Sequence, residues 1–213
     1  LLQCIGDIVN PNDPFQVTIF SALLIGFFLF LRKSNLVPDT LSSFDPTKQF
    51  TRSKFLHSMA PTGNRLVVAQ ITWSKTLQYQ NKVLTVPLLT IPGSVICPVW
   101  WLFRMVQMTP APPSAPVFCI KDKRGELRPL TYPVISAQFK DWVAKVGFNS
   151  SNYTMHSLRR GGASWASKKD IPTHFIKVLG NWASEAYLRY ISTDAEVKLT
   201  AQRHFKNSMF DDV

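Results

Sequence analysis

Residues 153–191 read YTMHSLRRGGASWASKKDIPTHFIKVLGNWASEAYLRYI, which brings a histidine, several arginines and several tyrosines close together in the chain. His156 and Arg159 are three residues apart, so on a helix both would project from one face. An arginine fork can clamp two phosphate oxygens, a histidine can donate or shuttle a proton, and a tyrosine hydroxyl can attack phosphorus. The stretch therefore favours phosphate chemistry.

The composition favours one well-cored domain with a polyanionic partner. The chain has 213 residues, 46% of them hydrophobic, and we expect a single domain over residues 1–213. Lysine and arginine together number 24 against 13 aspartates and glutamates, which gives a formal charge of +11. This surplus favours binding to a polyanion, although it does not identify which one.

The cysteines and histidines predict no metal site. Cys4, Cys97 and Cys119 lie far apart without C-x-x-C spacing, which fits a reducing compartment and argues against zinc. The four histidines are also scattered, and no pair of them has ligand spacing.

An apolar helix is expected near the start of the chain. Asp13 is suited to cap its N-terminus and Pro14 to occupy its first position, with the helix running through residues 15–31. The uninterrupted apolar part, residues 22–31, is shorter than the ~20 residues that a membrane span needs. We therefore interpret it as a buried core helix, with membrane anchoring as the lesser alternative, and we expect no signal peptide.

The remaining pattern predicts a mainly helical α+β domain with a small antiparallel sheet. Residues 65–74 and 82–88 are β-branched and aromatic runs that predict a hairpin. Residues 37–64 predict a loop with at most a short strand, and residues 117–120 a second short strand.

Further helices are expected in the second half of the chain. Apolar residues at near-helical spacing over 98–108 indicate core packing, and a helix is expected over 132–146. A capping box at 193–196 would begin a last helix through residue 205.

Several short motifs of this sequence resemble those of the tyrosine recombinase (phage integrase) family. They are GFFLFLRKSNL at 26–36, TWSKTLQ at 72–78, HSLRRGGAS at 156–164 and RYI at 189–191, in the family's order over nearly the whole chain. The resemblance implies the family's catalytic-domain fold. The catalytic residues that it implies are Arg32, Lys75, His156, Arg159, Trp182 and the nucleophile Tyr190.

Local evidence leaves alternatives at several of these positions. Lys82 competes with Lys75 across the hairpin, and Asn181 occupies the family's more usual register beside Trp182. Tyr187 lies three residues before Tyr190, and its other role would be packing.

The glycines and the first arginine also have alternative explanations. Gly161 and Gly162 would each cost about 1 kcal/mol in an ordinary helix interior, so close packing or close approach of DNA explains them better. Arg32 could simply complement a helix dipole. The family usually places an acidic residue three positions after this arginine, where this chain has Asn35.

The resemblance implies DNA strand cleavage and rejoining through a 3′-phosphotyrosine intermediate, with no metal or nucleotide cofactor. Within the family, these motifs are similar to those of the DIRS, Ngaro and crypton mobile-element recombinases, which implies site-specific recombination or integration. Double-stranded DNA would be the partner, bound by a homo-oligomer (a tetramer) that assembles through the C-terminal helix, without a membrane.

The resemblance also bears on domain organisation and location. We expect the family's N-terminal core-binding domain to be absent from residues 1–213. A eukaryotic mobile element would place the protein in the nucleus, and another source in the cytoplasm or nucleoid. The alternative functions are DNA relaxation like that of a type IB topoisomerase, and a domesticated, non-catalytic DNA-binding module.

Overall fold

A computed structural model of the chain describes residues 1–59, 63, 65–73, 83–180, 182 and 187–188. The helices in these ranges are α1 (Leu2–Ile8), α2 (Pro14–Phe28), α3 (Lys33–Leu36), α4 (Pro98–Met108), α5 (Tyr132–Lys145), α6 (Met155–Lys168) and α7 (Thr173–Leu179). Short 3-10 turns occupy Leu41–Ser43, Arg52–Lys54 and Ser150–Asn152.

Two small antiparallel sheets complete the described part of the fold. The first has the strand order β1 (Phe55–Met59), β2 (Arg65–Ile71) and β3 (Leu84–Leu89). In β2 every second residue is buried, at Val67, Ala69 and Ile71, because alternate side chains point to the same face of a sheet. The second sheet pairs β4 (Cys119–Lys121) with β5 (Leu127–Pro129). The expected α+β class, mainly helical with a small antiparallel sheet, is confirmed.

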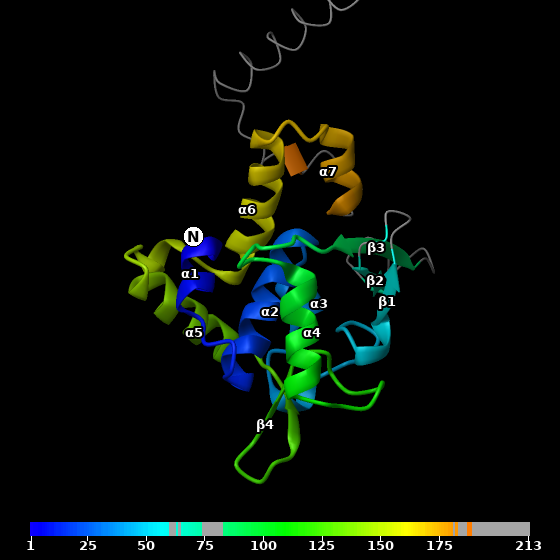
Figure 1. Cartoon of the computed structure of the whole chain (residues 1–213), viewed down its shortest axis with the longest axis vertical. Helices are drawn as coiled ribbons and strands as arrows, with labels where there is room; N and C mark the ends of the chain where they lie inside the picture. The colour runs from blue at the N-terminus through cyan, green and yellow to red at the C-terminus, as the bar shows by residue number, and fades with distance from the viewer. Residues whose placement is uncertain (60–62, 64, 74–82, 181, 183–186, 189–213) are drawn as a thin grey trace, which may run out of the picture.

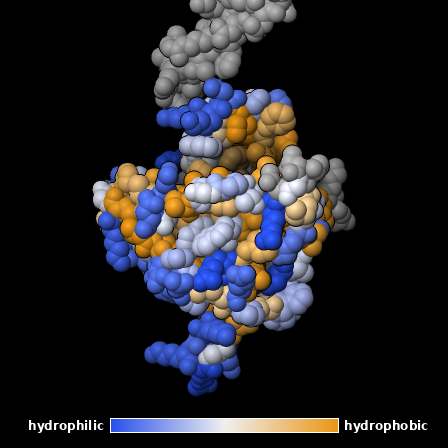
Figure 2. Space-filling view, in the orientation of Figure 1, coloured by the Kyte–Doolittle hydropathy of each residue, from blue (hydrophilic) through white to orange (hydrophobic). Residues whose placement is uncertain are grey.

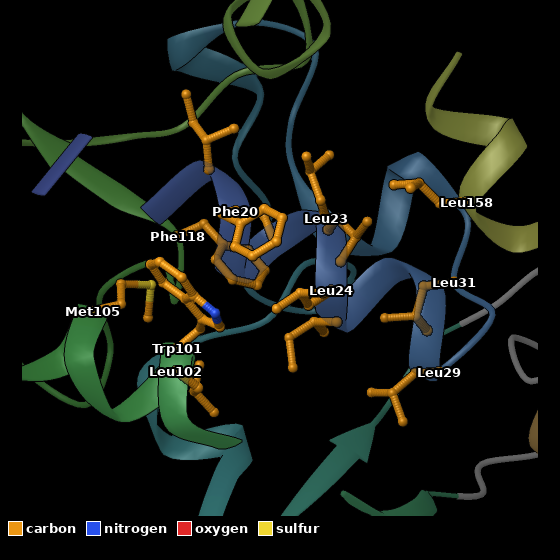
Figure 3. Close-up of a cluster of buried hydrophobic side chains, with 14 of the residues drawn as sticks. Phe20, Leu23, Leu24, Leu29, Leu31, Trp101, Leu102, Met105, Phe118 and Leu158 are labelled. Atoms are coloured by element: carbon orange, nitrogen blue, oxygen red, sulfur yellow. The ribbon is translucent and has the colours of Figure 1, made fainter. Parts of the chain in front are cut away.

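Helix α2 is the centre of the hydrophobic core. Its residues Val17 to Gly26 are all buried, and the helix packs against α4, α6 and α5. Figure 3 shows Phe20 of α2 beside Trp101 of α4, with Leu102 and Met105 of α4 close by. The edge-to-face contact of Phe20 with Trp101, at 4.9 Å between ring centroids, is a favoured aromatic geometry. The expected buried helix is therefore present, and no described helix is long and apolar enough to cross a membrane.

The start of α2 agrees with the sequence prediction, and its end differs. The Asp13 carboxylate accepts hydrogen bonds from the backbone N–H groups of Phe15 and Gln16, and Pro14 is the first helical residue. The helix ends at Phe28 instead of residue 31, because Phe30 adopts a left-handed backbone with φ of +48°. The Leu31 N–H then bonds back to the Gly26 carbonyl at 3.0 Å, which closes the helix with a wide turn.

The elements are arranged around α2 so that α6 and α7 lie together at one end of the molecule (Figure 1). The β4–β5 hairpin projects from the opposite end, and Figure 2 shows its tip as a hydrophilic projection. In that hairpin Arg128 pairs with Asp122 and Glu126, so part of its basic charge is neutralised locally. The end formed by α6 and α7 is where the phosphate-chemistry motif lies.

Candidate active site

The turn after α2 presents both a side chain and a backbone group to α6. Phe30 is among the non-glycine residues with positive φ, a conformation that costs of order 1 kcal/mol or more and persists only when its surroundings hold it. Arg32 follows as the N-cap residue of α3, in extended backbone conformation. The turn therefore separates the core helix from Arg32 and leaves the Phe30 carbonyl available to a neighbour.

Helix α6 begins with a capping box, and the H-x-x-R pair follows directly, with His156 in the first turn of the helix. The Thr154 side chain accepts from the Ser157 N–H, and the Ser157 hydroxyl accepts from the Thr154 N–H at 3.0 Å. His156 lies in this first turn with an exposed side chain, whereas Arg159, one turn later, is only 3% exposed.

Gly162 allows α6 to pack closely on the end of α2. A β-carbon built on Gly162 would lie 2.4 Å from the Phe27 carbonyl oxygen and 2.6 Å from the Phe30 ring, closer than real contacts allow. A β-carbon on Gly161 would meet only the Phe27 ring, at an ordinary 3.9 Å. Close packing thus explains Gly162, and the same argument does not apply to Gly161.

The buried guanidinium of Arg159 is held between two backbone carbonyls and an indole ring. It donates from Nη1 to the Phe30 carbonyl and from Nη2 to the Gly180 carbonyl, the latter at 3.0 Å. The centre of the guanidinium lies 4.0 Å from the centroid of the Trp182 ring. A cation over an aromatic face is attractive, by about 2 kcal/mol or more where water is excluded. Arg159 is therefore fixed from three directions.

Trp182 belongs to a small hydrophobic cluster next to this arginine. Its ring is 8% exposed and packs on Phe30 and Tyr187, and the cluster is completed by Ala163, Ala166 and Ile176. Tyr187 is 5% exposed. The absence of a side chain at Gly180 makes room for the indole, since a β-carbon there would lie 1.6 Å from a Trp182 ring carbon.

Arg32 and His156 lie near Arg159, and the arginines make the site positively charged. Partial desolvation of the imidazole and the charges of Arg159, Arg160 and Arg32 lower the pKa of His156. The lowered pKa favours the neutral imidazole, which can donate one hydrogen bond. Arg32, Arg159 and Gly180 also line one small pocket, together with Asn35 and Ile71.

Asn35, which lines this pocket, bonds to the chain just beyond strand β2. Its side chain is 3% exposed, and its Nδ2 donates to the backbone carbonyl of Trp73 at 2.7 Å, across 38 residues of sequence. Trp73 lies just beyond the end of β2. The residue at the family's usual acidic position therefore links α3 to the end of this strand.

The structure brings together four of the six predicted catalytic residues: Arg32, His156, Arg159 and Trp182. They come from three separate segments of the chain, at the start of α3, in α6 and after α7. Lys75 and its competitor Lys82, Asn181, and the predicted nucleophile Tyr190 lie outside the described residues, as does the expected last helix. The catalytic roles of all six residues stay predictions.

Sequence reasoning missed the backbone groups of the site. The carbonyls of Phe30 and Gly180 hold Arg159, but every residue has a carbonyl, so sequence carries no mark of which ones face inward. The glycine in the word LGNW at residues 179–182 was an available signal, because glycine permits close approach of a neighbouring ring. Among the described residues, no group of three or more His, Cys, Asp or Glu could hold a metal ion.

Comparisons with known proteins give structural relatives only. No protein-family model and no curated protein matches the chain. The XerH site-specific recombinase bound to difH substrate is similar at a TM-score of 0.62 and 15% identity, over 94% of this chain and 50% of that one. A Flpe–Holliday junction complex has a TM-score of 0.55 and 13% identity, over 86% and 42%.

A third relative extends the comparison to a transposon protein. The Tn1549 transposon integrase in complex with circular intermediate DNA has a TM-score of 0.52 and 14% identity, over 93% of this chain and 63% of that one. The chain thus spans about half the length of the first of these proteins. At such low identities the likeness concerns the fold alone, and the chain shares the fold of structurally characterised tyrosine recombinases.

Proposed function

We propose that this chain cuts and rejoins DNA strands through a tyrosine that becomes bonded to phosphorus. The observation that carries the proposal is the position of Arg159, a buried arginine held by two carbonyls and Trp182, with Arg32 and His156 beside it. All three solved relatives were captured with DNA, which supports double-stranded DNA as the partner.

The charges of the site suit the transition state of phosphoryl transfer. Negative charge accumulates on the non-bridging oxygens as phosphorus becomes pentavalent, and preorganised positive groups stabilise it. Arg32 and Arg159 would face these oxygens, and a neutral His156 would donate a hydrogen bond. Arg159 donates one N–H to each of two backbone carbonyls, and these two bonds fix the orientation of its guanidinium plane.

The proposed reaction exchanges one phosphoester bond for another. The Tyr190 hydroxyl gives its proton to water, a step that the positive charge of the two arginines would favour, and its oxygen bonds to phosphorus while the bond from phosphorus to the 5′ oxygen breaks. Lys75 gives a proton to the departing 5′ oxygen. The 3′-phosphotyrosine product conserves the bond energy, so a 5′-hydroxyl of a second strand can reverse the step.

We also propose a biological role, a cellular location and an assembly for this protein. The resemblance to DIRS, Ngaro and crypton recombinases supports recombination or integration of a mobile element, and a nuclear location if that element is eukaryotic. Assembly as a tetramer on DNA through the C-terminal helix would place several such sites together. The Tn1549 relative supports the link to transposition.

The decisive test is a search for a covalent protein–DNA adduct. The protein is incubated with a library of nicked duplexes with random sequence at the nick, and adducts are recovered after denaturation and sequenced. Tyr190→Phe should abolish the adduct and retain binding. Tyr187→Phe is the matched control, since this ring packs on Trp182 and its variant should still form the adduct.

The alternatives predict other outcomes of this experiment. A nucleotide remnant mapped to Tyr187 would overturn the choice of Tyr190. Adducts with relaxation of supercoils, but no exchange of strands, would indicate topoisomerase-like activity. DNA binding without any adduct would leave a non-catalytic module.

A further inference from the structure

Asn35 is a buried polar side chain that the proposed reaction does not use. It lies in α3, three residues after Arg32, and lines the same small pocket as Arg32 and Arg159. An asparagine amide offers two N–H donors, whereas a carboxylate at this position would offer none. The chemistry of this residue is therefore matched to an acceptor.

The acceptor is the carbonyl of Trp73, at the point where the chain leaves the three-stranded sheet. The distance of 2.7 Å from Nδ2 to the carbonyl oxygen marks a strong hydrogen bond, and the side chain is only 3% exposed. The bond is part-buried, so loss of the Asn35 donor would leave the Trp73 carbonyl without this partner. The bond thus fixes the end of β2 against α3.

This link connects the two sides of the proposed reaction. Arg32, on the α3 side, would act on the phosphate oxygens. Lys75, the predicted proton donor to the leaving oxygen, follows Trp73 by two residues, and two residues of chain span at most about 7 Å. The position of the Trp73 carbonyl therefore limits how far that lysine can reach.

We propose that Asn35 is a positioning residue for protonation of the leaving group, acting by holding the end of β2 beside Arg32. This inference rests on the proposed function, and within it assigns Asn35 to the departing 5′ oxygen and not to the charge on phosphorus. A displacement of about 1 Å at a reacting group can cost on the order of 10²-fold in rate.

The test uses a substrate that needs no proton donor. A duplex recovered as an adduct with the wild-type protein is prepared in two forms, one with the ordinary 5′ oxygen and one with sulfur at that bridging position. A thiol is far more acidic than an alcohol, with a pKa of about 8.5, so it departs without a proton. Rates of adduct formation are measured on both forms, with Lys75→Ala as the reference for a lost proton donor.

Asn35→Asp and Asn35→Ala should each slow cleavage of the ordinary substrate by about 10²-fold and cleave the sulfur substrate at the wild-type rate. The matched control is Gln49→Glu. Gln49 is a neighbouring buried amide that donates to the Ser34 carbonyl at 2.9 Å and does not bond to Trp73. Because Ser34 lies in α3 beside Arg32, any loss of rate in Gln49→Glu should be the same on both substrates.

A second measurement does not depend on cleavage. Amide hydrogen exchange in a peptide containing Ile71 and Trp73 should be faster in both Asn35 variants than in Gln49→Glu. Slow cleavage that sulfur fails to restore, or wild-type cleavage of the ordinary substrate, would overturn the proposal. Failure of the proposed function would differ, because the wild-type protein itself would then give no adduct while the exchange result would still test the link.

Discussion

Substituting Gly162 by alanine tests whether the site depends on the close approach of α6 to α2. The new methyl group would lie 2.4 Å from the Phe27 carbonyl oxygen and 2.6 Å from the Phe30 ring. The carbonyl belongs to the backbone of α2 and cannot rotate away as a flexible side chain could. The two helices must therefore move apart.

The size of the effect follows from two opposing contributions. Overpacking a well-packed interior costs about 1–3 kcal/mol. Replacing glycine by alanine inside a helix returns about 1 kcal/mol through helix propensity. Gly162→Ala should therefore lower the free energy of unfolding by up to about 2 kcal/mol. Gly161→Ala has the same propensity gain without the clash, so it should be neutral or stabilising by up to about 1 kcal/mol.

The measurement is urea unfolding of both variants and the wild-type protein, followed by circular dichroism. Adduct formation should fall in Gly162→Ala, because the Phe30 carbonyl that holds Arg159 moves with the turn. Equal stability of the two variants would refute the reasoning, since it would mean that the helices are not in the close contact described.

Three further predictions concern other parts of the chain. Asp13→Ala should lower the free energy of unfolding by about 1 kcal/mol, measured by urea unfolding, because two N–H groups of α2 lose their acceptor. Arg159→Lys should retain the fold, by circular dichroism, and lose adduct formation, since an ammonium cannot hold two oxygens in a fork; near-normal cleavage would remove Arg159 from the active site. Because the pKa of His156 is lowered in the folded state, the unfolded state binds a proton first as the pH falls below about 6.5. The free energy of unfolding should therefore decrease from pH 7 to pH 5, and it should decrease less in His156→Gln. Equal decreases in the two proteins would contradict the lowered pKa.

Sequence alone predicted the start of α2 better than its end. Asp13 and Pro14 are local signals, since capping and the fixed φ of proline act within a few residues. The end depends on Phe30, whose left-handed backbone is held by contacts with α6 and Trp182 from distant parts of the chain. An unbroken apolar run carries no sign of such a turn.

The strand signals show a similar division. The runs that form β2 and β3 were predicted because they are rich in β-branched and aromatic residues, and in the structure alternate residues of both strands are buried. Strand β1 was predicted only as a possible short strand within residues 37–64, since just one of its five residues, Phe55, is buried. An edge strand with so little buried surface gives a weak pattern.

For the candidate site, sequence predicted the side chains and left out what positions them. His156 and Arg159 were recognised by their spacing, and Trp182 was assigned to the pocket. The structure adds that the Trp182 ring face packs on Arg159 and that two backbone carbonyls hold the guanidinium. These are long-range relations, and no local pattern specifies them.

The described residues form one large hydrophobic core around α2 and a second cluster of six buried side chains around Trp182. Because the second cluster contains few buried side chains, it should open locally at a lower free energy than global unfolding requires. Arg159 bonds to the Phe30 carbonyl on one side of this cluster and to the Gly180 carbonyl on the other, so opening separates its two anchors. An anion bound to Arg159 only in the closed form would then stabilise α7 in proportion to the logarithm of the anion concentration. Protection of α7 amides from hydrogen exchange would thus report binding at the arginine.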